Sequence, residues 1–222
     1  MELNRKRKLE DASSIASDTS SKPSTSTKKS TQKDDIYLQF WSRASEPWNK
    51  LSNFAWIKEG IEYDGLVYPS TEHAFQAQKF IRKDRIRFSV DGDIGKVDDG
   101  FALFYSDDSV EKKKEFWMKK GNIGILAKMA TSNANFSKLK LVLEASYDYK
   151  KSNALWLDLL ALKFEIPHFK DILLSTESKI LLEFDRTATP SSWYCCKFLD
   201  GALVGNNQMG KLIMQVRDSI YD

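Results

Sequence analysis

The sequence predicts an α+β fold that is predominantly helical: a multihelical single domain with a small antiparallel sheet near its N-terminal part. Two observations predict it. Short apolar and aromatic runs between residues 36 and 68 suit strands, and from residue 72 onward apolar residues recur at helical spacing. The 222 residues, 41% hydrophobic and 12% aromatic, give room for one domain with a sizeable core and an appended tail.

Residues 1–35 are expected to form a disordered tail before the folded domain at 36–222. The tail contains eight Ser, four Thr and no aromatic residue, so it cannot bury enough apolar surface to offset the entropy lost on ordering. Its basic cluster from Arg5 to Lys8 resembles a nuclear localisation signal, and a solvated run of charge is the alternative. With no secretory signal and no run of roughly 18 apolar residues, we expect an intracellular protein, cytoplasmic or nuclear, without a membrane partner.

Charge is almost balanced in the expected domain. The tail holds eight Lys or Arg against six Asp or Glu, which leaves 26 against 25 in the rest of the chain. A nearly neutral domain has no bulk electrostatic attraction for a phosphate backbone, although a local basic patch stays possible. This balance argues against a plain nucleic-acid-binding protein.

The cysteines and histidines do not form a metal-binding pattern. Cys195 and Cys196 are neighbours, which makes a poor disulfide and supplies too few ligands for a structural zinc site. We interpret them as reduced and partly buried, with a redox pair as the alternative. His73 and His168 lie far apart in sequence, so a histidine-based metal site is not expected.

The elements are predicted in order from local signals. Strands are expected at 36–41 and as a pair at 55–57 and 61–63, and the dipeptide Asp64-Gly65 before 66–68 indicates a hairpin. Pro69 then introduces a helix over 72–83, with Ser70 or Thr71 as its N-cap. The three glycines and four aspartates between 91 and 100 indicate a loop or an insertion. Further helices are expected at 110–120, 123–130, 135–147, 152–164, 168–174 and 211–221, with a short strand at 180–184.

The segment from Gly205 to Lys211 matches the G-x-x-x-x-G-K pattern of a phosphate-binding P-loop. The next position must be Ser or Thr to hold Mg²⁺, and here it is Leu212, so the P-loop interpretation fails. A glycine and asparagine turn that enters a helix still offers backbone N–H groups to an anion. An ordinary helix cap at Asn206 or Asn207 is the alternative.

Glu72 is the strongest catalytic candidate on the predicted helix. It shares one face with Gln76 and Lys79, and a carboxylate, an amide and an ammonium together suit acid–base chemistry beside a phosphate. The alternative is an ordinary surface glutamate that favours the helix dipole. Aromatic residues at 41, 48, 54, 56, 193 and 194 are mostly expected in the core, and some could stack on a planar base.

Several segments, taken in order, resemble the NADAR domain, also called the YbiA-like family. The most specific is Y-P-S-T-E-H-A-F-Q-A-Q-K-F at 68–80, which contains Glu72. The others lie at 51–54 (L-S-N-F), 63–65, 160–164, 181–183, 193, 205–210 and 212–217. The resemblance spans about 36–222, with an insertion expected at about 84–120.

The resemblance implies a hydrolase that cleaves the N-glycosidic C–N bond of a ribosyl-linked substrate. The implied substrates are an ADP-ribosylated guanine base or a phosphoribosylamino-type intermediate of riboflavin synthesis, with no metal and no cofactor. Nucleic acid is then a partner only as a modified substrate. The family's key glutamate maps onto Glu72, which would act as base or as stabiliser of the transition state.

The same resemblance implies a set of substrate-binding residues. Lys79 and the turn at 205–210 would hold phosphate, and Phe54 or Trp193 would stack on the base. The implied binding set is Ser52, Asn53, Phe54, Gln76, Lys79, Trp193, Gly205, Asn207 and Gly210.

The chain departs from the family pattern at two catalytic positions. A tryptophan usually precedes the helix that ends in Lys-Phe, and here only Tyr147 or Tyr149 stands there, with Trp117 as an alternative. The acidic residue expected three positions before Trp193 is missing, and Asp185 could substitute for it. These departures keep a second hypothesis open, namely a module that binds ADP-ribose or a nucleotide without cleaving it.

Overall fold

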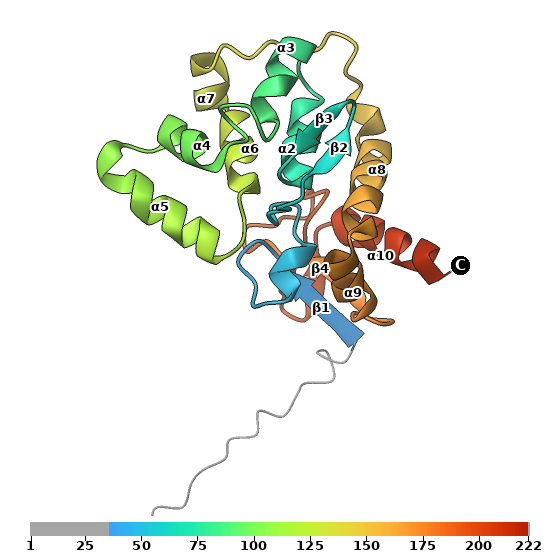
Figure 1. The fold of residues 1–222 in the computed structure, drawn as a ribbon. Coiled ribbons are helices and arrows are strands. Elements are labelled where there is room, and N and C mark those ends of the chain that lie inside the picture. The colour runs from blue at the N-terminus through green and yellow to red at the C-terminus, as the bar shows by residue number, and fades with distance from the viewer. Residues whose placement is uncertain (1–35, 222) are drawn as a thin grey trace, which may run out of the picture. The chain divides into compact units, whose positions relative to one another are not determined.

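The computed structural model describes residues 36–221, and this part of the chain has the predicted helical α+β fold (Figure 1). The expected disordered tail at 1–35 and its basic cluster from Arg5 to Lys8 lie outside the described residues. No helix within 36–221 combines the length and the apolar character needed to cross a membrane.

Two strands from opposite ends of the domain pair with each other. β1 (Tyr37–Phe40) and β4 (Ile180–Glu183) run parallel, with Leu38 opposite Leu181 and Phe40 opposite Glu183. The strands expected at 36–41 and 180–184 are thus confirmed. Their parallel pairing was not predicted, because a pairing between residues some 140 positions apart leaves no local signal in the sequence.

The predicted hairpin is confirmed at β2 (Ile61–Tyr63) and β3 (Leu66–Tyr68), which pair antiparallel. Asp64 and Gly65 both have positive φ, at 51° and 66°, as a two-residue hairpin turn of this kind requires. The strand expected at 55–57 is wrong. The backbone N–H of Ala55 donates to the carbonyl of Ser52, and those of residues 56 and 57 donate to the carbonyls of Gly121 and Pro69, in two further segments, so no ladder forms.

Helix α2 (Thr71–Ala77) lies at the centre of the domain and is buried on every side. Ser70 is its N-cap, as predicted, and its hydroxyl accepts a hydrogen bond from the backbone N–H of His73. The predicted extension to residue 83 is wrong, because α2 ends at Ala77 and a separate helix, α3 (Arg82–Arg85), follows.

A strand-like segment explains where α2 ends. The backbone N–H of Glu144 donates to the carbonyl of Lys79, and the backbone N–H of Ile81 donates to the carbonyl of Val142. These bonds use backbone groups that a longer α2 would need for itself. The helix expected at 135–147 is wrong for the same reason, since α7 (Asn133–Lys138) stops before this crossing.

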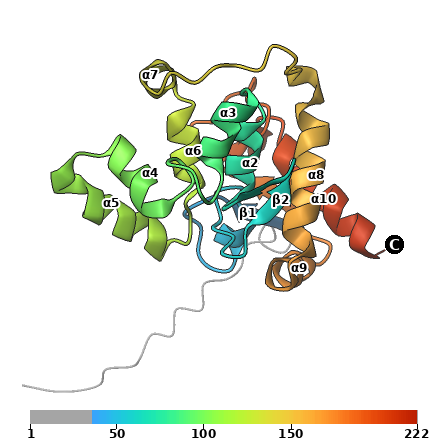
Figure 2. The same cartoon turned by 45° about the horizontal axis from the view of Figure 1, so that its top comes forward.

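The remaining helices surround α2. Figure 2 shows α4 and α5 together on one side of it and α8 and α10 on the other. The helices expected at 110–120, 123–130, 152–164, 168–174 and 211–221 are confirmed within a few residues. The bounds are η1 (Trp48–Leu51), η2 (Ile86–Phe88), α4 (Val97–Phe104), α5 (Asp107–Lys119), α6 (Gly124–Ala130), η3 (Tyr149–Lys151), α8 (Ser152–Glu165), α9 (Pro167–Leu174) and α10 (Gln208–Tyr221).

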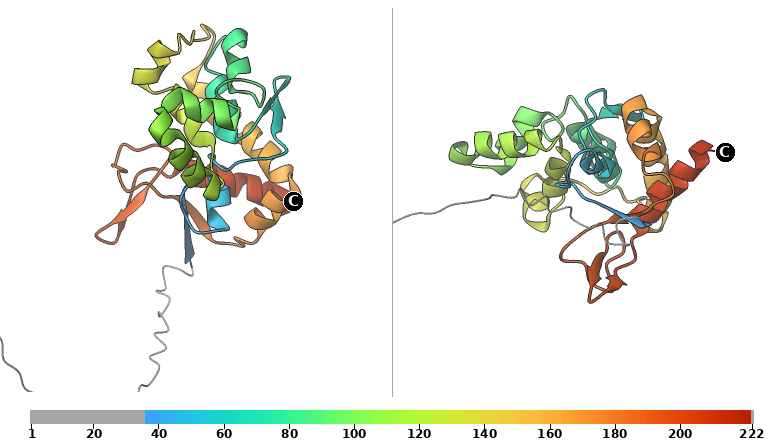
Figure 3. Two further views of the ribbon diagram at one scale, coloured as in Figure 1. Left: turned by 60° about the vertical axis from the view of Figure 1, so that its left-hand side comes forward. Right: turned by 90° about the horizontal axis from the view of Figure 1, so that it is seen from below.

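A helix after residue 96 and a second hairpin were not predicted. The loop expected at 91–100 already contains the start of α4, where Asp98 and Asp99 lie in the first turn and favour the helix dipole. A second antiparallel hairpin, β5 (Lys197–Leu199) and β6 (Ala202–Val204), projects from the helices (Figure 3). Its turn is Asp200-Gly201, both with positive φ, which is the same signal that identified the first hairpin.

The start of α10 is fastened to β4 by one side chain. The Asn207 side-chain amide donates to the carbonyl of Leu181 at 2.8 Å and accepts from the backbone N–H of Glu183 at 2.9 Å. Gly210 lies so close that an added Cβ would be 2.2 Å from the carbonyl oxygen of Leu181. Asn207 therefore fixes the position of β4 where the strand ends at Glu183.

We expect Asn207→Ala to lower the free energy of unfolding by about 3 kcal/mol, because two backbone groups of β4 lose their partners and alanine disfavours positive φ. Asn206→Ala is the matched control, since Asn206 is exposed and should cost less than about 1 kcal/mol. Urea denaturation measures both. Equal losses for the two variants would contradict the role assigned to Asn207.

Candidate active site

Glu72 lies in the first turn of α2 and lines a cavity of about 270 Å³. Its backbone N–H donates to the carbonyl of Asn53 at 3.1 Å, and its side chain is only about 5% exposed. The cavity is lined by Asn53, Glu72, Phe75, Gln76, Lys79, Lys128, Tyr147, Tyr149, Ser152, Trp156, Glu183, Tyr194 and Met209. The structure thus brings together five of the expected site residues, namely Asn53, Glu72, Gln76, Lys79 and Tyr149.

The Glu72 carboxylate has several donors and cations around it. Gln76 donates its side-chain N–H to Oε1 of Glu72 at 2.7 Å. Burial raises the pKa of Glu72, while the charge of Lys128, the Gln76 hydrogen bond and the charge of Lys79 act against this rise. The carboxylate form of Glu72 is therefore the form that its neighbours favour.

A second carboxyl group, Glu183, lines the same cavity and was not among the predicted site residues. It is the last residue of β4, and the surface that it leaves exposed opens onto the cavity. Burial raises the pKa of Glu183 to about 8, and the negative charge of Glu72 contributes to the rise. The only sequence signal for it was its place in the segment 181–183 of the family resemblance.

Lys128 is a second unpredicted site residue. It lies on α6, which packs against α2, and its charge lowers the pKa of both Glu72 and Glu183. Gly124 at the start of α6 allows this close packing, because an added Cβ would lie 2.5 Å from Cα of Phe54 and 3.1 Å from Cβ of Glu72. No motif in the sequence indicated that α6 contributes to the site.

A second cavity, of about 480 Å³, adjoins the first. The two share Lys128, Glu183 and Tyr194. The second cavity is lined by Trp41, Ser42, Ser52, Phe54, Lys128, Glu183, Phe184, Asp185, Ser192, Trp193, Tyr194 and Cys195. It therefore gathers the expected site residues Ser52, Phe54, Asp185 and Trp193, and Glu183 lies where the two cavities meet.

Asp185 is occupied within its own turn. Its carboxylate accepts hydrogen bonds from the backbone N–H and the hydroxyl of Thr187, at 2.8 and 2.7 Å. These bonds lower the pKa of Asp185. The residue lines the second cavity but not the cavity of Glu72, so Glu183 rather than Asp185 lies beside Glu72.

Aromatic side chains form walls of the Glu72 cavity. Phe75 and Trp156 stack with ring centroids 4.0 Å apart, and the exposed ring of Tyr149 stands edge-on to Tyr147. Trp156 was missed because it fits the apolar stripe of α8. Trp117, the alternative considered from sequence, lies on α5 and lines neither of the two cavities.

A fully buried lysine positions the loop at 51–54. The Nζ of Lys163 donates to the carbonyl of Ser52 at 2.8 Å and approaches that of Leu51 at 3.3 Å. Burial lowers the pKa of Lys163 to about 7. The loop in turn holds Asn53, whose carbonyl accepts from the Glu72 backbone and from the Thr71 hydroxyl.

The turn at 205–210 packs against the protein backbone. Gly205, Asn207 and Gly210 are not among the residues that line either cavity. An added Cβ on Gly205 would lie 2.3 Å from the carbonyl oxygen of Cys195. In this structure the turn holds β4 and the segment before β5 in place.

The cysteines agree with the sequence prediction. Both thiols are free, with Cys195 half-buried at the second cavity and Cys196 buried.

His73 is buried behind Glu72 and bonds to the Ser70 hydroxyl at 2.8 Å through Nδ1. Burial lowers the pKa of His73 to about 3, so the ring is neutral. Within 36–221, no group of three His, Cys, Asp or Glu residues is placed to hold a metal ion.

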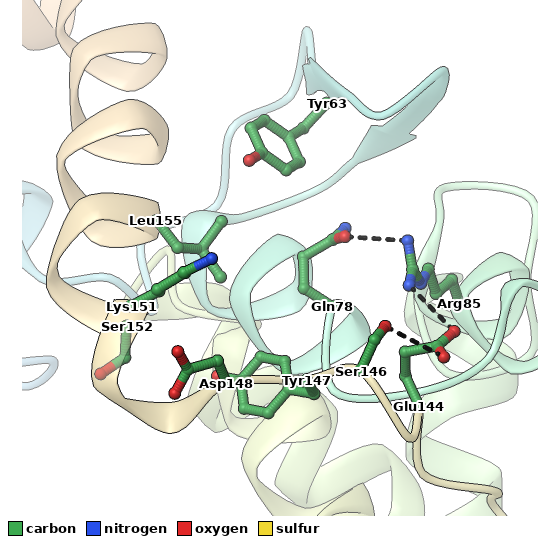
Figure 4. Close-up of a pocket in the computed structure, with 10 residues that line it drawn as sticks. All are labelled: Tyr63, Gln78, Arg85, Glu144, Ser146, Tyr147, Asp148, Lys151, Ser152 and Leu155. Carbon is green, nitrogen blue, oxygen red and sulfur yellow. Dashed lines mark hydrogen bonds and ion pairs between the residues drawn. The ribbon is translucent and has the colours of Figure 1, made fainter.

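A third cavity, of about 270 Å³, shares Tyr147 and Ser152 with that of Glu72. Figure 4 shows Lys151 of η3 and Leu155 of α8 at this cavity, below Tyr63 of β2. The cationic side chain on its far side, Arg85, is already paired with Asp64 at 2.7 Å and Glu144 at 3.5 Å, as well as bonding Gln78. The charge of Arg85 is therefore balanced by two carboxylates.

Comparisons with known proteins give one similar structure. No protein-family model matches this chain, and no curated protein does. The NMR structure of the Escherichia coli protein YbiA matches at 23% identity over 84% of this chain and 86% of that chain, with a TM-score of 0.49. A similarity of this extent identifies neither a family nor an activity, so function has to follow from the residues of the site.

The raised pKa of Glu183 predicts a pH-dependent stability. Its carboxyl favours the protonated form when folded, so its contribution is complete below pH 4.5 and is lost as the pH rises through about 8. Glu183→Gln cannot ionise and avoids this loss. The free energy of unfolding of the variant relative to wild type should therefore increase from pH 5 to pH 8.5, measured by urea denaturation. A constant difference across this range would contradict the prediction.

Proposed function

We propose that this chain is a hydrolase that cleaves the N-glycosidic C–N bond of a ribosyl-linked substrate. One observation carries the proposal: the buried carboxylate of Glu72 lies in a cavity with a second carboxyl group, Glu183, and a lysine, Lys128. Paired carboxyl groups in different electrostatic environments are typical of enzymes that break glycosidic bonds.

The chemistry of the bond explains why a carboxylate is needed. Cleaving a ribosyl–nitrogen bond builds positive charge on the sugar ring and requires a water molecule to attack the anomeric carbon. A carboxylate held in a protein environment stabilises that charge more strongly than one in water, and it can also accept the proton of the attacking water. Glu72 is a carboxylate of this kind, and the hydrogen bond from Gln76 holds it in place.

The surroundings of Glu72 fit a phosphorylated ribosyl substrate. Lys79 and Lys128 provide positive charge for phosphate, and the Phe75–Trp156 stack and the Tyr149 ring offer apolar faces to a base. The adjoining second cavity provides space for a larger group and adds Trp193 at its wall. The ordered sequence segments that resemble the NADAR domain support the same substrate class, an ADP-ribosylated guanine base or a phosphoribosylamino-type riboflavin intermediate.

The position of Asp185 favours a second candidate. Its carboxylate is held by Thr187 and lies outside the Glu72 cavity. If turnover requires an acidic group supplied from that segment, the protein would instead be a module that binds ADP-ribose or a nucleotide without cleaving it. The two candidates share the binding cavity and differ only in product release.

We expect Glu72→Gln to lower turnover by about 10³-fold, within the range that general acid–base groups contribute. Glutamine keeps the size of the side chain but can neither accept a proton nor balance the charge on the sugar. The assay follows release of ADP-ribose from ADP-ribosylated guanine nucleic acid and release of the free base from phosphoribosylamino-type riboflavin intermediates. Binding of ADP-ribose to the variant, followed by calorimetry, should stay within about tenfold of wild type.

Glu62→Gln is the matched control, since Glu62 is exposed on β2 away from the lining of the Glu72 cavity. It should retain wild-type turnover. Full activity of Glu72→Gln would refute the role of Glu72. Tight binding of ADP-ribose by wild type, with no product from either substrate class, would establish the binding module instead.

A further inference from the structure

We propose that Glu183 is the proton donor to the departing nitrogen, acting opposite Glu72 in the cleavage reaction. The assignment rests on the proposed function and adds a second catalytic residue to it. It divides the chemistry between two elements: α2 supplies the carboxylate that acts at the sugar, and β4 supplies the acid that acts at the leaving group.

The position of Glu183 is fixed through its backbone. Its N–H donates to the side-chain oxygen of Asn207 at 2.9 Å, and its carbonyl accepts from the backbone N–H of Cys196 at 2.8 Å. The strand thus places the side chain of Glu183 where the two cavities meet, and this side chain lines both of them. A substrate that extends from one cavity into the other has to pass this residue.

The carboxyl group itself is left available. Within residues 36–221, no hydrogen bond is made to the side-chain oxygens of Glu183, although the carboxyl of Glu72 is held by Gln76 and that of Asp185 by Thr187. Glu183 is half-buried and lines both cavities, so its carboxyl is open to a group that enters them. A substrate atom that accepts its proton would provide the missing partner.

The charges around Glu183 favour its protonated form. Glu72 on α2 and Asp185 beyond β4 repel its negative charge, whereas Lys128 on α6 and, more weakly, Lys163 on α8 attract it. The nearby thiols of Cys195 and Cys196 have raised pKa values, and both stay neutral. With burial as the largest influence, the pKa of Glu183 rises to about 8, so roughly nine-tenths of it carries a proton at pH 7.

Burial also raises the pKa of Glu72, but its neighbours Lys128, Gln76 and Lys79 all act against the rise and favour its charged form. Two neighbouring carboxyl groups resist ionising together, so one proton is expected to reside mainly on Glu183. The pair is then prepared with one acid and one base before the substrate arrives.

The proposed step balances in protons and electrons. As the C–N bond breaks, its electron pair goes to the nitrogen, which takes the proton of Glu183. Water forms a new C–O bond at the anomeric carbon and gives a proton to Glu72. The products are a free base with an N–H group and a ribosyl group with a new hydroxyl. Transfer of a proton from Glu72 to Glu183, directly or through solvent, restores the starting state.

The test compares two leaving groups in Glu183→Gln. A ribosyl substrate with a neutral purine needs protonation to leave, whereas one with a pyridinium nitrogen already carries the positive charge. We expect Glu183→Gln to lower kcat for the purine substrate by about 10²–10⁴-fold and to change kcat for the pyridinium substrate by less than about threefold. Glu72→Gln should lose both activities.

The pH dependence of kcat gives a second readout on the purine substrate alone. Wild-type kcat should fall as the pH rises through about 8, because the acid loses its proton, and the residual kcat of Glu183→Gln should be flat there. Glu165→Gln, an exposed residue at the end of α8, serves as control and should behave as wild type. Thermal melting of each variant verifies that it is folded.

Each outcome distinguishes the two proposals. Equal losses of Glu183→Gln on both leaving groups, full activity on the purine, or an unchanged fall of kcat near pH 8 would overturn the role of Glu183 while leaving the hydrolase in place. If folded wild-type protein releases no product from any of these substrates, the proposed function itself fails, and the assignment of Glu183 fails with it.

Discussion

The arrangement of this domain depends on two carboxyl groups that are held side by side where burial disfavours the charge of both. Glu72 comes from the start of α2 and Glu183 from the end of β4. The positive charge of Lys128 from α6 acts on both and lowers the pKa of each. Each group taken alone would lower stability. Together with one shared proton and one lysine the cluster is close to neutral, which makes its burial tolerable and gives the two carboxyl groups different chemical roles.

Holding these groups requires rigid backbone, and several polar residues are used for that purpose. The amide of Asn207 bonds to the carbonyl of Leu181 and the N–H of Glu183 in β4, and the ammonium of Lys163 bonds to the carbonyls before Asn53. Gly124 lets α6 approach α2 closely enough to place Lys128. These residues act on the main chain, so the positions of the two carboxyl groups are set by hydrogen bonds and packing some distance behind the cavity.

Features that depend on neighbouring residues could be predicted from the sequence, and features that depend on distant contacts could not. The hairpin at Asp64-Gly65 and the N-cap at Ser70 were predicted because their conformations depend on the residues themselves. The end of α2 at Ala77 was not, because a segment some 65 residues later takes its backbone hydrogen bonds. Glu72 was found through the pattern of its own helix and the flanking resemblance. Glu183 and Lys128 were missed because only the tertiary fold brings β4 and α6 to that helix.

The buried polar residues of the domain divide by what they bond. Lys163 and Asn207 bond to backbone carbonyls, and Ser70 bonds to His73, so each satisfies a group inside the protein and explains its own burial. Glu72, which is buried, and Glu183, which is half-buried, instead line a cavity. Because burying a carboxyl group lowers stability, this second class is the one that we propose contacts a substrate. The same distinction separates Glu183 from Asp185, whose carboxylate is already satisfied by its own turn.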